Sequence, residues 1–273
     1  MSNRSGGDGS RRPTKAERKE EARLERERIQ RQMAARKRNR TLGLVVIASA
    51  VAIVVALVFI TQNGDSSASD LPTPQSLLDQ AASEATTAGC DQIQQEGFYG
   101  GVSDTKSPDY EDQAHVGEDQ RFPEMPPIDS YPSQPPTSGP HAGIPPGPLP
   151  GGAYDSPPDL GRAIHSLEHG GTIIWYSPDV SGQAAATIDR IKEFYGQTDD
   201  VGQDRVIIAP YDYDQAGGQL PKGTQMALVS WHKLQTCAQP NLAVAFDFTS
   251  QYSFPAIMDR QYQGEAPEPG ASM

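Results

Sequence analysis

The 273-residue sequence has only two cysteines, and they do not form a Cys-x-x-Cys motif, so a redox pair of the thioredoxin type is not expected. It also lacks a dinucleotide fingerprint, a P-loop and a serine nucleophile elbow, which disfavours nucleotide chemistry. Long stretches free of helix breakers are scarce, because 26 Gly and 24 Pro are spread along the chain. This composition excludes a plain helical bundle, whereas 10 Tyr and 36% hydrophobic residues are sufficient for a folded core.

Basic side chains are scarce outside the first 40 residues. The whole chain has 23 Lys and Arg against 35 Asp and Glu, but residues 1–40 hold 14 of the basic side chains and 6 acidic ones. Glu–Arg pairs such as Glu20–Arg23 have helical spacing, so we expect a solvated helix that touches anionic lipid. Nucleic-acid binding is not expected, because the segment has no aromatic platforms.

One long apolar run interrupts this polar chain. Residues 42–60 contain no charge, and 19 helical residues match a hydrocarbon core of roughly 30 Å. Arg and Lys residues at 36–40 precede the run, so the positive-inside rule predicts a single-pass cell-membrane protein with a cytoplasmic N-terminus and an extracytoplasmic body. Cleavage near Ser66–Ala68 is the alternative, although the basic region is far longer than that of a signal peptide.

The composition predicts five segments. A polar linker follows the transmembrane helix, and 13 of the 24 prolines then fall within residues 121–158. That stretch is either a disordered spacer or an ordered loop lying across a domain. The predicted segments are a basic tail (1–40), a transmembrane helix (41–61), a linker (62–85), an extracytoplasmic domain (86–262) and a disordered tail (263–273).

The sequence of the predicted exported body indicates alternating helices and strands. Asp159 can cap a helix that runs to His169 and stops at Gly170-Gly171. The segment near Ala243 begins either a strand or the last helix. Further helices are predicted at 76–88 and 182–195, and strands at 172–176, 206–209 and 226–231. A helix between two strands implies parallel neighbours, so we expect an α/β (α+β) sandwich with a mixed β-sheet and flanking helices.

Cys90 and Cys237 both lie on the predicted exported side of the membrane. Disulfides persist in oxidising compartments, so one structural bridge between the beginning and the end of the domain is expected. Two free thiols are the alternative, since the sequence does not show that the residues approach each other.

Four of the five histidines lie between residues 115 and 169, and two of them form the motif His165-Ser-Leu-Glu168-His169. Positions four apart share a helix face, so His165 and His169 could chelate one metal ion. Helical angles place them opposite the apolar stripe, facing water or the Pro-rich segment that carries His141. We hypothesise that His141, His165 and His169, together with His115, bind zinc or copper. The alternative is that the imidazoles interact with the helix C-terminus.

The motifs of the body resemble a known bacterial family. They are PPTSGPH (135–141), HSLEHGGTIIWY (165–176) and ALVSWHKLQTC (227–237), with Gly152–Asp155 and IIAP (207–210) between them. This combination is similar to the domain-of-unknown-function family numbered 3105, over about residues 89–260. The resemblance implies one membrane span and an extracytoplasmic domain, with the four histidines and both cysteines in the signature. The chain departs from the signature at His232, where the family has Gly, and the resemblance implies no activity.

Three functions compete on the sequence. The first is a membrane-anchored metal-binding domain. The second is an envelope protein-interaction module that presents its Pro-rich loop to a partner. The third is a metallohydrolase of the H-x-x-E-H type with Glu168 as the general base, which is disfavoured because the helix ends directly after His169. The sequence therefore favours a binding or interaction domain over an enzyme, and leaves the oligomeric state open.

Overall fold

A six-stranded mixed sheet lies at the centre of the part of the chain that the computed structural model describes, residues 71–198 and 202–273. Its strand order is β1-β8-β7-β5-β6-β4. The strands are β1 (Gln94–Gln95), β4 (Gly152–Ala153), β5 (Thr172–Tyr176), β6 (Val206–Pro210), β7 (Met226–Ser230) and β8 (Lys233–Cys237). A second, two-stranded sheet pairs β2 (His115–Val116) with β3 (His141–Ala142). The helices are α2 (Pro74–Thr87), α3 (Leu160–Glu168), α4 (Gln183–Gln197) and α5 (Leu242–Tyr252), with 3-10 turns η1 (Tyr99–Gly101), η2 (Ile128–Ser130) and η3 (Gln203–Arg205).

The order of strands follows from the connections. β5 and β6 are parallel neighbours joined through α4, as a strand–helix–strand crossover requires. β7 and β8 form an antiparallel hairpin, and β7 also pairs antiparallel with β5. The expected mixed sheet with flanking helices is confirmed.

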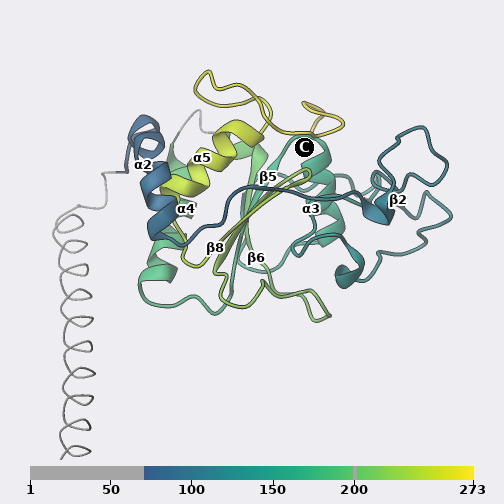
Figure 1. The fold of residues 1–273 in the computed structure, drawn as a ribbon, viewed down its shortest axis with the longest axis horizontal. Helices are drawn as coiled ribbons and strands as arrows, with labels where there is room; N and C mark the ends of the chain where they lie inside the picture. The colour runs from purple at the N-terminus through teal and green to yellow at the C-terminus, as the bar shows by residue number, and fades with distance from the viewer. Residues whose placement is uncertain (1–70, 199–201) are drawn as a thin grey trace, which may run out of the picture. The chain divides into compact units, whose positions relative to one another are not determined.

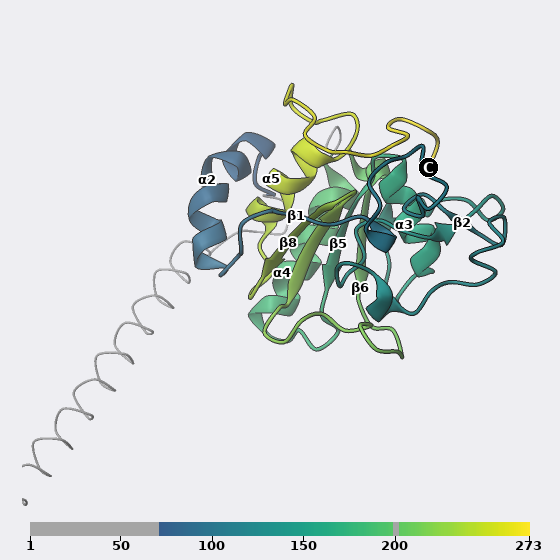
Figure 2. The same cartoon turned by 45° about the vertical axis from the view of Figure 1, so that its right-hand side comes forward.

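Side chains of the central strands alternate between two buried faces. In β5, Ile174 belongs to the core cluster that also holds α4 and α5, whereas Ile173 and Trp175 belong to the cluster that holds α3. This period of two gives a helix-covered layer on each side of the sheet. Figures 1 and 2 show α2, α4 and α5 on one side and α3 on the other.

The domain begins earlier than the sequence predicted. α2 starts at Pro74, capped by the Thr73 hydroxyl, and buries Leu77 and Ala81. Leu77 lies in the same core cluster as α5. The second half of the predicted linker, 62–85, is therefore part of the fold, because its apolar face packs on the last helix. The segment near Ala243, left open between strand and helix, is the helix α5.

The predicted disordered tail, 263–273, packs on the domain instead. Backbone hydrogen bonds join Glu268 N to Glu168 O (3.0 Å) and Gly270 N to His169 O (3.2 Å), and the Arg205 guanidinium donates to Ala271 O (2.8 Å). The chain end lies over α3 in Figure 1. These contacts could not be predicted from the acidic, Pro-containing composition of the tail, because backbone atoms of the tail make most of them.

No helix within residues 71–198 and 202–273 has the length and apolarity to cross a bilayer. The predicted transmembrane segment and the basic tail lie outside the described residues.

Candidate metal centre

Helix α3 positions three polar side chains on the face opposite its apolar stripe. Asp159 caps the helix by accepting a hydrogen bond from Arg162 N (2.9 Å), which fixes where the first turn begins. Ile164 and Leu167 are buried toward the sheet. His165, Glu168 and His169 therefore lie on the other face, and all three are nevertheless buried.

The Pro-rich segment covers that face and is ordered. The Tyr131 hydroxyl donates to Pro140 O (2.6 Å), and Leu149 N donates to Ser166 Oγ on α3 (2.8 Å). The parallel pairing of β2 with β3 places His115 opposite His141. Two histidines that are 26 positions apart thus become neighbours above the helix that carries the other two. Of the two alternatives left open by the sequence, the ordered loop is correct.

The donor atoms converge on a small volume. One ligand atom from each of His115, His141, His165 and Glu168 can be chosen so that all four lie within 4.8 Å of one another. Oε2 of Glu168 is 2.9 Å from His141 Nε2, 3.6 Å from His115 Nε2 and 3.9 Å from His165 Nε2. A zinc ion holds its nitrogen and oxygen ligands at about 2.0–2.2 Å, which puts ligand atoms roughly 3.3–3.5 Å apart in a tetrahedron. The cluster therefore needs only a small contraction to enclose one ion.

Three of the histidines have a fixed tautomer. Their Nδ1 atoms face backbone carbonyl oxygens, which only accept hydrogen bonds, so each Nδ1 must donate its proton. The distances are 2.8 Å from His141 to Gly139 O, 2.6 Å from His165 to Ala142 O and 2.7 Å from His169 to Ser272 O. When these three rings are neutral, the Nε2 lone pair of each is then available. Metal-binding histidines show the same arrangement, because the ring nitrogen that does not bind the metal donates a hydrogen bond to a nearby carbonyl or carboxylate.

The Nε2 atoms lack enough hydrogen-bond donors. Nε2 of His165 faces Nε2 of His169 at 3.2 Å, so two acceptors meet unless one of them carries an extra proton. Nε2 of His115 is buried and has no hydrogen-bond partner. Such groups are costly to bury. One metal ion would satisfy several of these lone pairs at once.

Burial and charge shift two of the ionisable groups. Burial, together with the neighbouring His141 and His169, lowers the pKa of His165 to about 4, against the smaller opposing effects of the Ala142 carbonyl and Glu168. Burial raises the pKa of Glu168, but the contact of its carboxylate with His141 and the nearby His115 and His165 outweigh that effect, so its pKa is lowered overall. A neutral imidazole beside an ionised carboxylate is the ligand state that a divalent cation requires.

His169 lies beside the four-atom cluster rather than within it. Its Nε2 is 3.2 Å from His165 Nε2 and 3.6 Å from Oε2 of Glu268, a carboxylate on the C-terminal segment. The structure thus brings together His115, His141 and His165, with His169 at their edge. That these histidines bind a metal stays a prediction.

Two site residues were missed by the sequence prediction of ligands. Glu168, which was considered only as a general base, points its Oε2 into the cluster and accepts a hydrogen bond on Oε1 from Gln113 Nε2 (3.2 Å). Its position at i+3 from His165 placed it on the same helix face, so the sequence held that signal. Gln113 had no such signal, because the strand pairing that delivers it is not encoded locally.

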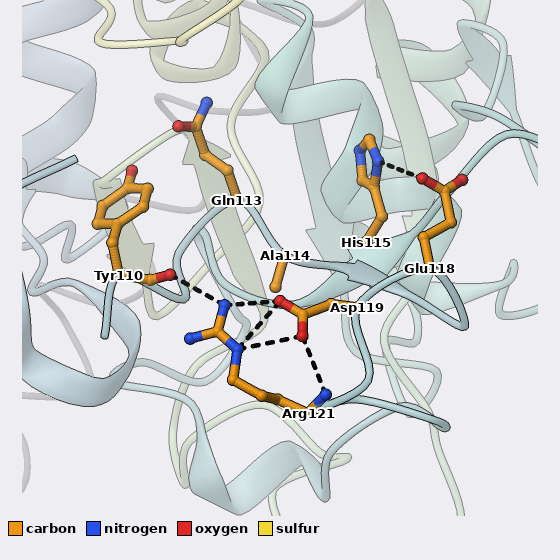
Figure 3. Close-up of a pocket in the computed structure, with 7 residues that line it drawn as sticks. All are labelled: Tyr110, Gln113, Ala114, His115, Glu118, Asp119 and Arg121. Carbon is orange, nitrogen blue, oxygen red and sulfur yellow. Dashed lines mark hydrogen bonds and ion pairs between the residues drawn. The ribbon is translucent and has the colours of Figure 1, made fainter. Parts of the chain in front are cut away.

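A surface hollow of about 380 Å³ borders the cluster at His115, and its other lining residues are Tyr110, Gln113, Ala114, Glu118, Asp119 and Arg121. In Figure 3 the His115 ring points toward Glu118, while Arg121 turns to Asp119 and to the Tyr110 carbonyl. The hollow is the open side of the otherwise buried cluster.

The expected disulfide between Cys90 and Cys237 is present. Cys237 belongs to the core cluster on the α4 and α5 side of the sheet, so the bridge lies on the face opposite α3. It closes a loop of 147 residues, from the end of α2 to the last strand.

Comparison with known proteins agrees with the motifs. A family model described as "Protein of unknown function (DUF3105)" matches residues 127–271. The match begins later and ends later than the predicted resemblance, and it includes the C-terminal segment that contacts α3. No curated protein matches the chain. No solved structure matches it either.

Proposed function

Because the chain belongs to the DUF3105 family of proteins of unknown function, its chemistry has to be inferred from the site, and we propose that the domain binds one transition-metal ion. His115, His141, His165 and Glu168 supply the ligands, and His169 lies next to them. We propose further that residues 42–60 anchor this domain to the outer side of a cell membrane. The basic residues before that segment and the Cys90–Cys237 disulfide support the location, since disulfides persist outside the cytoplasm.

One observation carries the metal proposal. Three imidazoles donate Nδ1 protons to backbone carbonyls, and the Nε2 atoms of two of them, His141 and His165, converge with the unpaired Nε2 of His115 and a buried carboxylate oxygen. Protons could satisfy the His141–Glu168 contact and the His165–His169 contact, one in each. His115 Nε2 would still lack a partner. A single cation serves the whole set, which is why we favour it over a network of protonated histidines.

The donor set favours zinc or divalent copper. Imidazole nitrogen and carboxylate oxygen suit both ions, whereas cuprous copper prefers thiolate and thioether ligands. Both cysteines are joined in the disulfide on the other face of the sheet, so neither supplies a thiolate.

Glu168 fits a ligand better than a general base. Its Oε2 lies at hydrogen-bond distance from a ligand imidazole, 2.9 Å from His141 Nε2, and its side chain is buried. A general base would instead need a water molecule between itself and the metal.

Partner binding through the Pro-rich loop stays a prediction. The side chain of Ile144 in that loop is 65% exposed, which supports it.

The test is the metal content of the full chain, purified in detergent without a polyhistidine tag and measured by mass spectrometry. We expect about one zinc or copper ion per chain in the wild type and a loss of most of it in His165→Ala, because three remaining ligands bind far more weakly. Tyr195→Phe is the control, since Tyr195 lies in the core cluster on the other face of the sheet, where its hydroxyl contacts Thr249, and its substitution should leave the metal content unchanged.

A folded wild-type chain that contains no metal and takes up neither added zinc nor added copper would refute the proposal. Equal metal content in His165→Ala and the wild type would show that the metal binds at another place in the molecule.

A further inference from the structure

The hollow beside His115 connects solvent to the buried cluster. His115 and Gln113 line it, and both side chains also approach Glu168, at 3.6 Å from His115 Nε2 and 3.2 Å from Gln113 Nε2. His141 and His165, in contrast, are 0% and 1% exposed. Among the described cluster residues that can hold an ion together, His115 is therefore the one reached from outside.

His115 is also held less firmly than the other histidines. No backbone carbonyl fixes its Nδ1, which instead lies 3.4 Å from Oε2 of Glu118, and its side chain is 31% exposed. Its Nε2 faces Glu168 without a hydrogen bond. The His115 ring thus has the Glu118 carboxylate on its solvent side and the buried cluster on its inner side.

Glu118 offers a negative charge at the mouth of the hollow. Its side chain is 55% exposed, and its Oε1 accepts a hydrogen bond from Ile144 N (3.2 Å), which holds the carboxylate in place. Arg121, the cation in the same hollow, pairs with Asp119 at 2.6 Å and with Glu111 at 3.4 Å. The charge of Glu118 is therefore left for a cation that arrives from solvent.

We propose that this hollow is the entry route for a divalent cation: Glu118 captures the ion, and His115 passes it to His141, His165 and Glu168. This inference rests on the proposed metal-binding function. It makes Glu118 a positioning residue for uptake rather than a ligand of the bound ion.

The structure offers a matched control on the opposite side of the cluster. Oε2 of Glu268 lies 3.6 Å from His169 Nε2, and its side chain is 60% exposed. Glu118 and Glu268 are thus similar carboxylates beside two different histidines. An entry route through the hollow requires only Glu118.

The experiment measures Zn²⁺ uptake by the metal-free full chain in stopped flow, and Zn²⁺ release to a chromogenic chelator. We expect Glu118→Gln to slow uptake and release by the same factor, about fivefold or more, because the attraction at the mouth is lost. The equilibrium Kd should stay within about twofold, since a route changes rates and not end states. Glu268→Gln should match the wild type in both rates.

The outcomes separate the two proposals. If the wild type takes up no Zn²⁺, the proposed function fails and the route with it. If Zn²⁺ binds but Glu118→Gln keeps wild-type rates, or Glu268→Gln slows equally, only the route is wrong. If Glu118→Gln instead raises the release rate and raises the Kd by the same factor, Glu118 is a ligand of the bound ion. That result would also overturn the route.

Discussion

His232 combines a backbone conformation that favours glycine with a buried ionisable ring. It turns the β7–β8 hairpin at φ 56°, the left-handed region, and is 2% exposed. Its Nε2 lies 2.9 Å from Oδ2 of Asp112, whose Oδ1 accepts hydrogen bonds from Ser138 Oγ (2.8 Å) and Tyr99 N (2.7 Å). Through this contact the His232 side chain connects the 112–116 segment, which carries His115, to the large sheet. The contact compensates for the cost of the left-handed backbone at the turn.

This pair makes stability depend on pH. Burial lowers the pKa of His232, but the hydrogen bond and charge of Asp112 reverse that effect, so its pKa is raised overall; Glu265 adds to the rise. A raised folded-state pKa means that the stabilisation is complete below the unfolded pKa of about 6.5 and is lost as pH rises through the folded value.

We therefore predict that His232→Asn lowers the free energy of unfolding by about 1–3 kcal/mol at pH 5.5, and by less at pH 9. Asn tolerates the left-handed backbone, so the substitution removes the charge without straining the turn. Urea unfolding of metal-free protein across this pH range measures the difference. A difference that stays constant, or grows, as pH rises would contradict the assignment.

At the scale of elements, the site depends on how closely α3 approaches β3. A Cβ on Gly161 would lie 2.9 Å from Met125 Sδ and 3.0 Å from Ala142 N. Ala142 also accepts the Nδ1–H hydrogen bond of His165 at 2.6 Å. The glycine thus permits the contact that orients a cluster histidine.

Gly161→Ala should lower the free energy of unfolding by about 1–3 kcal/mol, since Met125 can move but the backbone of Ala142 must shift with it. Zn²⁺ affinity should fall as well, because that shift disturbs His165. Gly196→Ala in α4 is the control: nothing lies within 4 Å of its added Cβ, so helix propensity should leave it neutral or up to about 1 kcal/mol more stable. Chemical unfolding and zinc titration of both variants check this, and a Gly161→Ala protein as stable as wild type would contradict it.

The elements that the sequence predicts well are those whose signals are local. Asp159, the apolar stripe of α3 and the run Thr172–Tyr176 each lie within one element, and the structure agrees with all three. The position of His141 over α3, the contact of Ser272 O with His169 and the role of Asp112 depend on residues far apart in the chain. Helical angles could show that His165 faced away from the core, but not what covered it.

At the scale of the whole domain, the disulfide and the histidine cluster lie on different faces of the sheet. The disulfide closes its 147-residue loop on the face covered by α2, α4 and α5, where Cys237 is buried. The histidine cluster lies with α3 on the other face, and the central strands separate the two. If the cluster binds an ion as proposed, this arrangement implies that the bridge affects the stability of the domain and not its affinity for the ion.

We therefore predict different responses of stability and zinc affinity to loss of the disulfide. Cys90→Ala with Cys237→Ala should lower the free energy of unfolding by about 5 kcal/mol on the chain-entropy model, because the unfolded chain loses a long closed loop. In protein that stays folded, the Kd for Zn²⁺ should remain within about twofold of wild type, since no ligand or outer hydrogen bond involves either cysteine. Thermal unfolding and zinc titration, with reduced wild type as the control, measure both quantities. A loss of zinc affinity in folded, disulfide-free protein would show that the two faces are coupled through the sheet.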